Sequence, residues 1–166
     1  MAHYFINAKL IDPEAGTLTE GTVIVEGEQI AAVVAGTPTL PADAQITDCQ
    51  GKYLAPGIVD LGVKVCEPGE RHKESYRSAG MAAAAGGVTT MITRPDTNPP
   101  IDSPEVLEFV TRRANEAAPV HVIPMAALTK ERAGREMTEI GFLMDAGAAA
   151  FTDCDHVISD TKVFSR

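Results

Sequence analysis

The chain has 166 residues, of which 45% are apolar and 22% are charged, and this composition is typical of a globular protein rather than a disordered or fibrous one. Its net charge of −9 argues against a duplex nucleic-acid binder and against a polybasic membrane anchor, because each needs a basic face. No apolar run approaches the ~20 residues of a membrane helix, and the first residues carry no secretory-signal pattern.

Residues 1–55 are expected to form a small N-terminal β subdomain. Short apolar and β-branched runs predict strands at 4–11, 22–25 and 29–34, and a further strand over 46–54 that is broken at Gly51. The two-residue turn Gly27-Glu28 between two of these runs predicts a β-hairpin. The strands are too short to enclose a large core alone, so we expect them to form part of a composite β-sandwich.

Residues 56–166 alternate between runs typical of strands and stretches typical of helices. We expect strands at 58–65, 88–93, 120–125 and 148–152. We expect a helix from about 73 to 85, a second with Ser103 at its N-cap and Pro104 at its first position, and a third along Met137, Ile140 and Met144. This alternation predicts parallel βα units, which leaves two closures open: a doubly wound open sheet or a (β/α)8 barrel.

A barrel would be incomplete, because eight units typically need ~250 residues and only about four fit here. We therefore expect residues 56–166 to be the first four units of a barrel whose remainder is absent or lies on another chain. A nucleotide-binding sheet is disfavoured, because neither a GxGxxG nor a GxxxxGK[ST] pattern occurs.

In either closure, functional side chains lie at the carboxyl ends of the parallel strands. The groups that follow the four predicted strands are Lys64, Cys66 and Glu67; Arg94, Asp96 and Asn98; Met125 and Thr129; and Asp153, Cys154, Asp155 and His156. The three cysteines of the chain are odd in number and form no CxxC pair, which favours reduced thiols in a cytoplasmic protein.

The stretch from Pro56 to Gly69, PGIVDLGVKVCEPG, resembles the start of the barrel in the amidohydrolase superfamily. It is most similar to the dihydroorotases of the class that associates with aspartate transcarbamoylase, in which the stretch reads PGxVDxHxHxREPG. Blocks at 72–74, 86–90, 95–99 and 150–153 match the family in the same order. The resemblance implies an α/β fold, namely the N-terminal half of an amidohydrolase-type TIM barrel with a small N-terminal β-sandwich subdomain. It also implies zinc and the hydrolysis of a cyclic amide, dihydroorotate, in pyrimidine biosynthesis.

The chain departs from the family where the family binds metal and substrate. The two metal-binding histidines of the family align with Gly62 and Lys64, and its substrate-binding arginine aligns with Cys66. Its substrate-binding asparagine aligns with Asp96, and Arg94 stands where the family has a methionine. Glycine has no donor atom and an ammonium repels a cation, so we expect no metal at Gly62 and Lys64 and no bound zinc.

A few residues remain candidates for a site. The resemblance makes Arg94, Asp96 and Asn98 candidates for substrate binding, and it makes Asp153 and Cys154 weaker candidates for metal binding, with Asp153 catalytic if the protein is active. An ion pair between Lys64 and Glu67 is the arrangement that we expect to fill the place of the metal.

Three hypotheses follow from these observations. The first is a non-catalytic dihydroorotase homologue that serves as a scaffold for aspartate transcarbamoylase. The second is a divergent, active cyclic amidohydrolase in which Asp153 and Cys154 supply a rearranged metal site and Arg94 binds the substrate carboxylate. The third is an open-sheet α/β module that binds a small molecule. We favour the first, with the C-terminal half of the barrel, a homo-oligomer or aspartate transcarbamoylase as partners, and with neither nucleic acid nor membrane among them.

Overall fold

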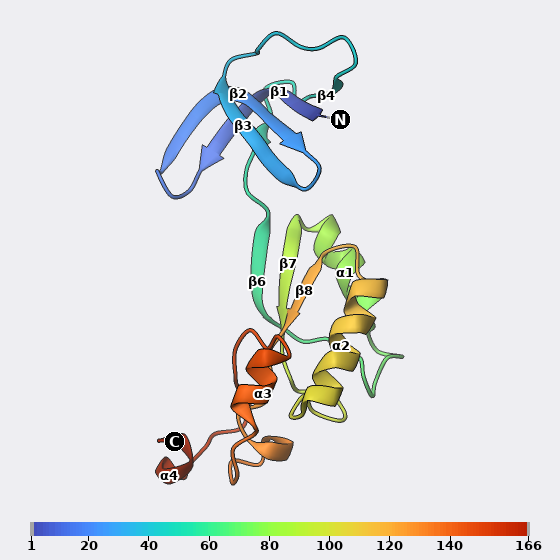
Figure 1. Cartoon of the computed structure of the whole chain (residues 1–166), viewed down its shortest axis with the longest axis vertical. Coiled ribbons are helices and arrows are strands. Elements are labelled where there is room, and N and C mark those ends of the chain that lie inside the picture. The colour runs from blue at the N-terminus through green and yellow to red at the C-terminus, as the bar shows by residue number, and fades with distance from the viewer. Residues whose placement is uncertain (1, 166) are drawn as a thin grey trace. The chain divides into compact units, whose positions relative to one another are not determined.

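The computed structural model describes residues 2–165 and contains two compact units, Met1–Pro56 and Gly57–Arg166. Figure 1 shows the strands and helices of each unit. Within residues 2–165, no helix combines the length and the apolarity that crossing a bilayer requires. The two units are described separately below.

The first unit is a five-stranded sheet. Its strands are β1 (Ala2–Asp12), β2 (Thr17–Glu26), β3 (Gln29–Ala35), β4 (Gln45–Asp48) and β5 (Tyr53–Leu54). The order is β3-β2-β1-β4, with β5 also paired to β1. The pairing of β2 with β3 is antiparallel, which confirms the predicted hairpin at Gly27, whose φ is +62°. The described residues of this unit form one sheet, and the second layer of the expected sandwich stays a prediction.

The second unit contains a parallel sheet in the order β6-β7-β8 (Figure 1). Its strands are β6 (Ile58–Val63), β7 (Val88–Thr93) and β8 (His121–Pro124). The predicted parallel βα arrangement is therefore confirmed for three strands. The strand predicted at 148–152 was wrong as a full strand, since it is reduced to one parallel bridge between Phe151 and Ala126. The backbone N–H groups of Ala149 and Thr152 still donate to the carbonyls of Pro124 and Ala126, at 2.9 and 3.0 Å. The segment 149–152 therefore continues the sheet beside β8.

The helices follow the expected order, with corrected bounds. They are α1 (Tyr76–Ala85), α2 (Pro104–Ala117), the 3-10 turn η1 (Lys130–Arg132), α3 (Ile140–Asp145) and α4 (Thr161–Phe164). Helix α1 begins three residues later than predicted, because Ser75 and Ser78 form a reciprocal capping box there. Helix α2 begins at Pro104 as predicted, although the Ser103 side chain makes no capping hydrogen bond. On α3, Leu143 rather than Met144 is buried.

Helices α1 and α2 pack against β7 and β8 and enclose the core of this unit (Figure 1). The fully buried side chains of that core include Val65, Tyr76, Met91, Ile101, Leu107, Val110 and Leu143. The strand residues that alternate with this core form a row in register, Leu61 beside Ile92 and Ile92 beside Ile123. Leu61 in this row is 74% exposed. The sheet thus has one face covered by helices and an apolar face that is open in this chain.

Candidate functional site

The carboxyl ends of β6, β7 and β8, together with the segment 149–152, surround a cavity of about 270 Å³, here called the mouth. Its lining residues come from all four of these elements: Gly62, Arg94, Met125, Thr152, Cys154 and Asp155. Parallel strands bring their carboxyl ends to one edge, which is why residues up to 93 positions apart in the sequence meet here.

A chain of four charged side chains begins at the mouth, where Arg94 and Asp155 line the cavity, and extends to Asp96 and Lys64. The Lys64 ammonium is 2.9 Å from Oδ2 of Asp96. The Arg94 guanidinium donates to the same carboxylate through Nε (3.2 Å) and Nη2 (3.0 Å), and Nη2 also donates to Oδ2 of Asp155 at 3.0 Å. The Asp96 side chain is only 4% exposed, so it is the buried centre of this group. We call Lys64, Asp96, Arg94 and Asp155 the ion chain.

The ion chain keeps its members charged. Burial alone would raise the pKa of Asp96, but the hydrogen bond from Lys64 and the two neighbouring positive charges outweigh burial and hold that pKa below its usual value. The hydrogen bond to Asp96 raises the pKa of Lys64. Burial opposes the charge of Arg94, yet its contacts with Asp155 and Asp96 raise its pKa further. A carboxylate held in this way has its lone pairs committed to cations of the protein itself.

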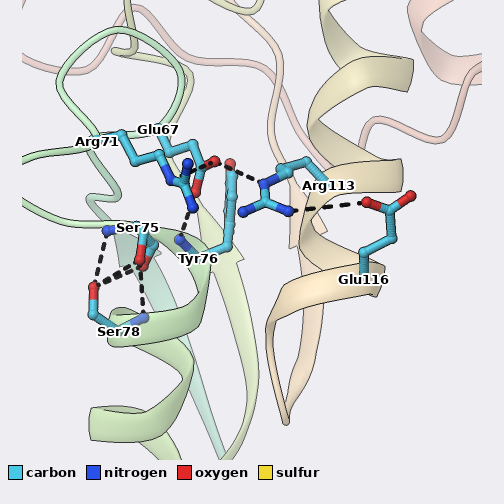
Figure 2. Close-up of polar contacts among 7 residues, drawn as sticks. All are labelled: Glu67, Arg71, Ser75, Tyr76, Ser78, Arg113 and Glu116. Atoms are coloured by element: carbon cyan, nitrogen blue, oxygen red, sulfur yellow. Dashed lines mark hydrogen bonds and ion pairs between the residues drawn. The ribbon is translucent and has the colours of Figure 1, made fainter.

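The expected ion pair between Lys64 and Glu67 was wrong. Glu67 lies in a second cluster, where its carboxylate accepts hydrogen bonds from Nε of Arg113 (2.8 Å) and from the backbone N–H of Tyr76 (3.0 Å). Arg71 adds a longer contact of 3.4 Å (Figure 2). Burial would raise the pKa of Glu67, but these donors outweigh it and lower the pKa. The carboxylate therefore joins the loop after β6 to the first turn of α1 and to α2.

Asp153 is buried, and its carboxylate is fully engaged within the protein. Oδ1 accepts hydrogen bonds from the backbone N–H groups of Leu128 and Thr129, each at 3.0 Å, and Oδ2 accepts one from the Thr129 hydroxyl. These contacts tie the segment after 152 to the loop after β8. The adjacent Cys154 has a φ of +57° and lines the mouth. In this arrangement Asp153 positions a loop, whereas Cys154 faces the cavity.

The remaining predicted residues lie outside the ion chain. Asn98 is exposed, and its backbone N–H donates to the carbonyl of Pro68 at 3.2 Å. Asn98 also packs so closely on Gly69 that a Cβ on that glycine would lie 2.5 Å from the Asn98 carbonyl oxygen. The structure therefore gives Asn98 a part in the fit of two loops. Reasoning from the sequence missed Arg113 as the partner of Glu67, although its place beside the buried positions of α2 was a usable signal.

The residues at the mouth do not fit a divalent metal ion. Gly62 offers no ligand atom, and its φ of +83° is a left-handed conformation that a histidine adopts only with strain. Lys64 presents a protonated ammonium at the second position. Among residues 2–165, no group of three or more His, Cys, Asp or Glu side chains is arranged to hold a metal ion. The His156 ring, which follows the segment 149–152, contacts the Arg132 carbonyl at 2.8 Å.

Comparisons with known proteins agree on one family. The profile of the family described as Dihydro-orotase-like matches residues 51–165. The chain is 39% identical over 163 residues to the dihydroorotase of Bacillus cytotoxicus, covering 98% of this chain and 37% of that protein. It is 37% identical over 158 residues to the dihydroorotase of Syntrophus aciditrophicus, covering 95% of this chain and 37% of that protein.

A solved structure shows the same fold over most of the chain. The L-hydantoinase (dihydropyrimidinase) from Arthrobacter aurescens superimposes with a TM-score of 0.78 at 26% sequence identity, covering 90% of this chain and 32% of that one. A crystal structure of a dihydroorotase, at 15% identity and a TM-score of 0.55, agrees in fold. The chain thus has the α/β fold of the amidohydrolases and spans about 37% of the length of the curated relatives it matches. From its sequence and its fold, the chain belongs to the dihydroorotase family.

Proposed function

We propose that this protein is a non-catalytic member of the dihydroorotase family that serves as a scaffold for aspartate transcarbamoylase in a larger assembly. The observation that carries the first part is the contact of 2.9 Å between the Lys64 ammonium and Asp96. Lys64 stands where the family resemblance implies a metal-binding histidine, and a cation of the protein therefore stands where the metal would bind.

The loss of metal and the loss of substrate recognition support one another. Hydrolysis of a cyclic amide in this family needs a metal-bound water whose pKa is brought toward neutrality. Cys66 replaces the arginine that would bind the substrate carboxylate, and a thiol lacks the two parallel N–H donors of a guanidinium. Arg94 is poorly placed to restore that function, because its Nε and Nη2 already donate to Asp96 and Asp155. A divergent active site built on Asp153 is likewise disfavoured, since Asp153 already accepts three hydrogen bonds.

The partners of the proposed scaffold follow from the open face of the sheet. β6 has one unpaired edge, and the row of Leu61, Ile92 and Ile123 is apolar. An unpaired edge beside exposed apolar side chains favours further strands as partners. We therefore propose that the remaining strands of the barrel cover this face, whether in the same polypeptide or on a second chain, and that the complete protein forms the oligomer that holds aspartate transcarbamoylase. The three free cysteines suit a reducing, cytoplasmic location.

Turnover by the full-length protein tests the catalytic part of the proposal. Ring opening of dihydroorotate should be undetectable with added zinc, while the dihydroorotase of Bacillus cytotoxicus, run as the positive control, should be active under the same conditions. Turnover comparable to that control would overturn the proposal. A rate that appears with other cyclic amides and disappears in the Asp153→Asn variant would favour the divergent enzyme instead.

Co-elution tests the scaffold part. The full-length protein, mixed with aspartate transcarbamoylase from the same organism, should elute from a sizing column as one complex of defined stoichiometry. Separate elution at micromolar concentrations of both proteins would contradict the scaffold role and leave the catalytic part untouched.

A further inference from the structure

The ion chain joins three of the four strand ends at the mouth, those of β6, β7 and the segment 149–152. Lys64 follows β6, Arg94 and Asp96 follow β7, and Asp155 follows the segment 149–152. The charges alternate along the chain, positive, negative, positive and negative, and each neighbouring pair is in contact at 2.9 to 3.0 Å. The four groups have no net charge together, so the cluster is satisfied without an external ion.

We propose that the ion chain takes the place of a metal ion as the cross-link between these strand ends, so that the mouth keeps its structure independently of metal. Like the proposed function, this proposal rests on the finding that the residues at the mouth do not fit a metal ion. It adds a structural role for residues of the ion chain that replace metal-binding or substrate-binding residues of the family. It predicts coupling between Lys64 and Asp96 and predicts that neither chelators nor zinc alter the stability of the protein.

The members of the ion chain differ in burial, and we expect their contributions to stability to differ accordingly. Asp96 is 4% exposed and accepts from both cations. Its replacement therefore removes the link between the ends of β6 and β7 and leaves Arg94 with Asp155 as its remaining partner in the ion chain. Lys64 is 54% exposed, and water screens its charge. We therefore expect Asp96 to matter most and Lys64 to matter mainly through Asp96.

The backbone conformation of β6 is consistent with an ion chain in place of a metal ion. The register between β6 and β7 passes from Leu61 opposite Ile92 to Val63 opposite Thr93, so Gly62 forms a bulge in the strand. A bulge and a φ of +83° at this position suit glycine, and a side chain there is strained even though a Cβ would meet no atom within 4 Å. The backbone of β6 thus suits an arrangement in which Lys64, and not the residue at 62, contacts Asp96.

A double-mutant cycle tests the proposal in the full-length protein. The cycle combines Lys64→Met with Asp96→Asn, and the matched control combines Lys73→Met with Glu70→Gln, an exposed ion pair of the same unit. Thermal unfolding should show that Asp96→Asn lowers the midpoint by about 3 °C or more and that the double variant loses much less than the sum of the two single losses. The control cycle should be additive. Additive losses at Lys64 and Asp96 would overturn the proposal.

Single variants of Lys64 and the effect of a chelator test the proposal independently of whether Asp96→Asn folds. If Asp96→Asn does not fold, Lys64→Met should still lower the midpoint more than Lys73→Met, and Lys64→Arg should restore it because it retains the charge. A chelator should leave the midpoint of the unaltered protein unchanged, and a fall on chelation or a rise with zinc would overturn the proposal. Dihydroorotate turnover alongside intact coupling would reject only the proposed function, and additive losses without turnover would reject only the ion chain.

Discussion

Glu67 shows how a single buried carboxylate organises a loop. Its side chain is 6% exposed and receives donors from Arg113, Arg71 and the first helical N–H of α1 (Figure 2). The position also places a negative charge at the N-terminus of α1, where the helix dipole favours it. A neutral amide at this position keeps the shape of the side chain but loses the charge that satisfies two guanidinium groups.

We therefore predict that Glu67→Gln lowers the free energy of unfolding of the full-length protein by about 1–3 kcal/mol. The matched control is Glu70→Gln, because Glu70 is 46% exposed and pairs with Lys73 at the surface. The control should be indistinguishable from the unaltered protein in urea denaturation. Equal losses in the two variants would show that the Glu67 cluster adds nothing beyond surface charge.

The lowered pKa values of Asp96 and Glu67 predict a pH dependence with a definite sign. Unfolded carboxyl groups titrate near ~3.9 for Asp and ~4.3 for Glu, so the folded state binds fewer protons than the unfolded state around these values. The stabilisation is fully present above the unfolded pKa values and is lost as the pH falls through the lower folded values. Urea midpoints should therefore fall progressively below about pH 4. The double variant Glu67→Gln, Asp96→Asn should flatten this fall, and an unchanged slope would contradict the account.

At this scale the sequence predicted the right residues but the wrong pairs. Lys64 was expected to bind Glu67, three positions away, yet it binds Asp96 on the neighbouring strand end. Neighbouring strand ends decide such contacts, because the register of a parallel sheet sets which side chains lie side by side. Arg94 and Asp96 were both expected at the site, and their contact with each other and with Asp155 required the positions of three segments.

At the scale of elements, local signals predicted best where they were strongest. The start of α2 at Pro104 follows from a proline, whose fixed φ suits the first helical position. The bounds of β7 were predicted at both ends, because the run from Val88 to Thr93 is mostly β-branched and is followed by Arg94-Pro95. The third helix is shorter than its pattern indicated, and the fourth strand is reduced to a bridge. Both of these segments depend on neighbours that lie outside their own sequence.

The close approach of α1 to the segment before β8 gives a test at this scale. A Cβ on Gly80 would lie 2.7 Å from Cδ of Pro119 and 3.0 Å from Cβ of Ala118. Gly80→Ala should therefore destabilise the protein by about 1–3 kcal/mol, because the crowding exceeds the gain in helix propensity. Gly141→Ala on α3, where a Cβ meets no atom within 4 Å, is the matched control and should be neutral or stabilising by up to about 1 kcal/mol. A stabilising Gly80→Ala would show that the helix is free to move away.

At the scale of the whole molecule, the apolar face of the sheet β6-β7-β8 that carries Leu61 is open in this chain. Leu61 is 74% exposed although it lies in the middle of a parallel strand, and strands of that kind are buried on both faces in complete α/β proteins. The alternation of elements correctly predicted the parallel α/β arrangement of β6, β7 and β8. The family resemblance was needed to choose the barrel over the open sheet, because both closures share the same local pattern.

We predict that Leu61→Lys destabilises the full-length protein by about 3 kcal/mol or more, because closure of the barrel would bury the added charge without a partner. Met81→Lys is the matched control: Met81 is 60% exposed, and it lies on α1 rather than on the open face of the sheet. The control should change stability by no more than about 0.5 kcal/mol. Small and equal effects in urea denaturation would show that the open face stays exposed in the complete protein.

The mouth holds an internal ion chain where the family resemblance implies a metal ion. Elemental analysis of the full-length protein, purified without chelator and dialysed against zinc, measures whether a metal binds there. We predict a zinc content far below one ion per chain, since Gly62 offers no ligand and the Lys64 ammonium is bound to Asp96. One tightly held zinc ion per chain, with its density beside Gly62 and Lys64, would contradict it.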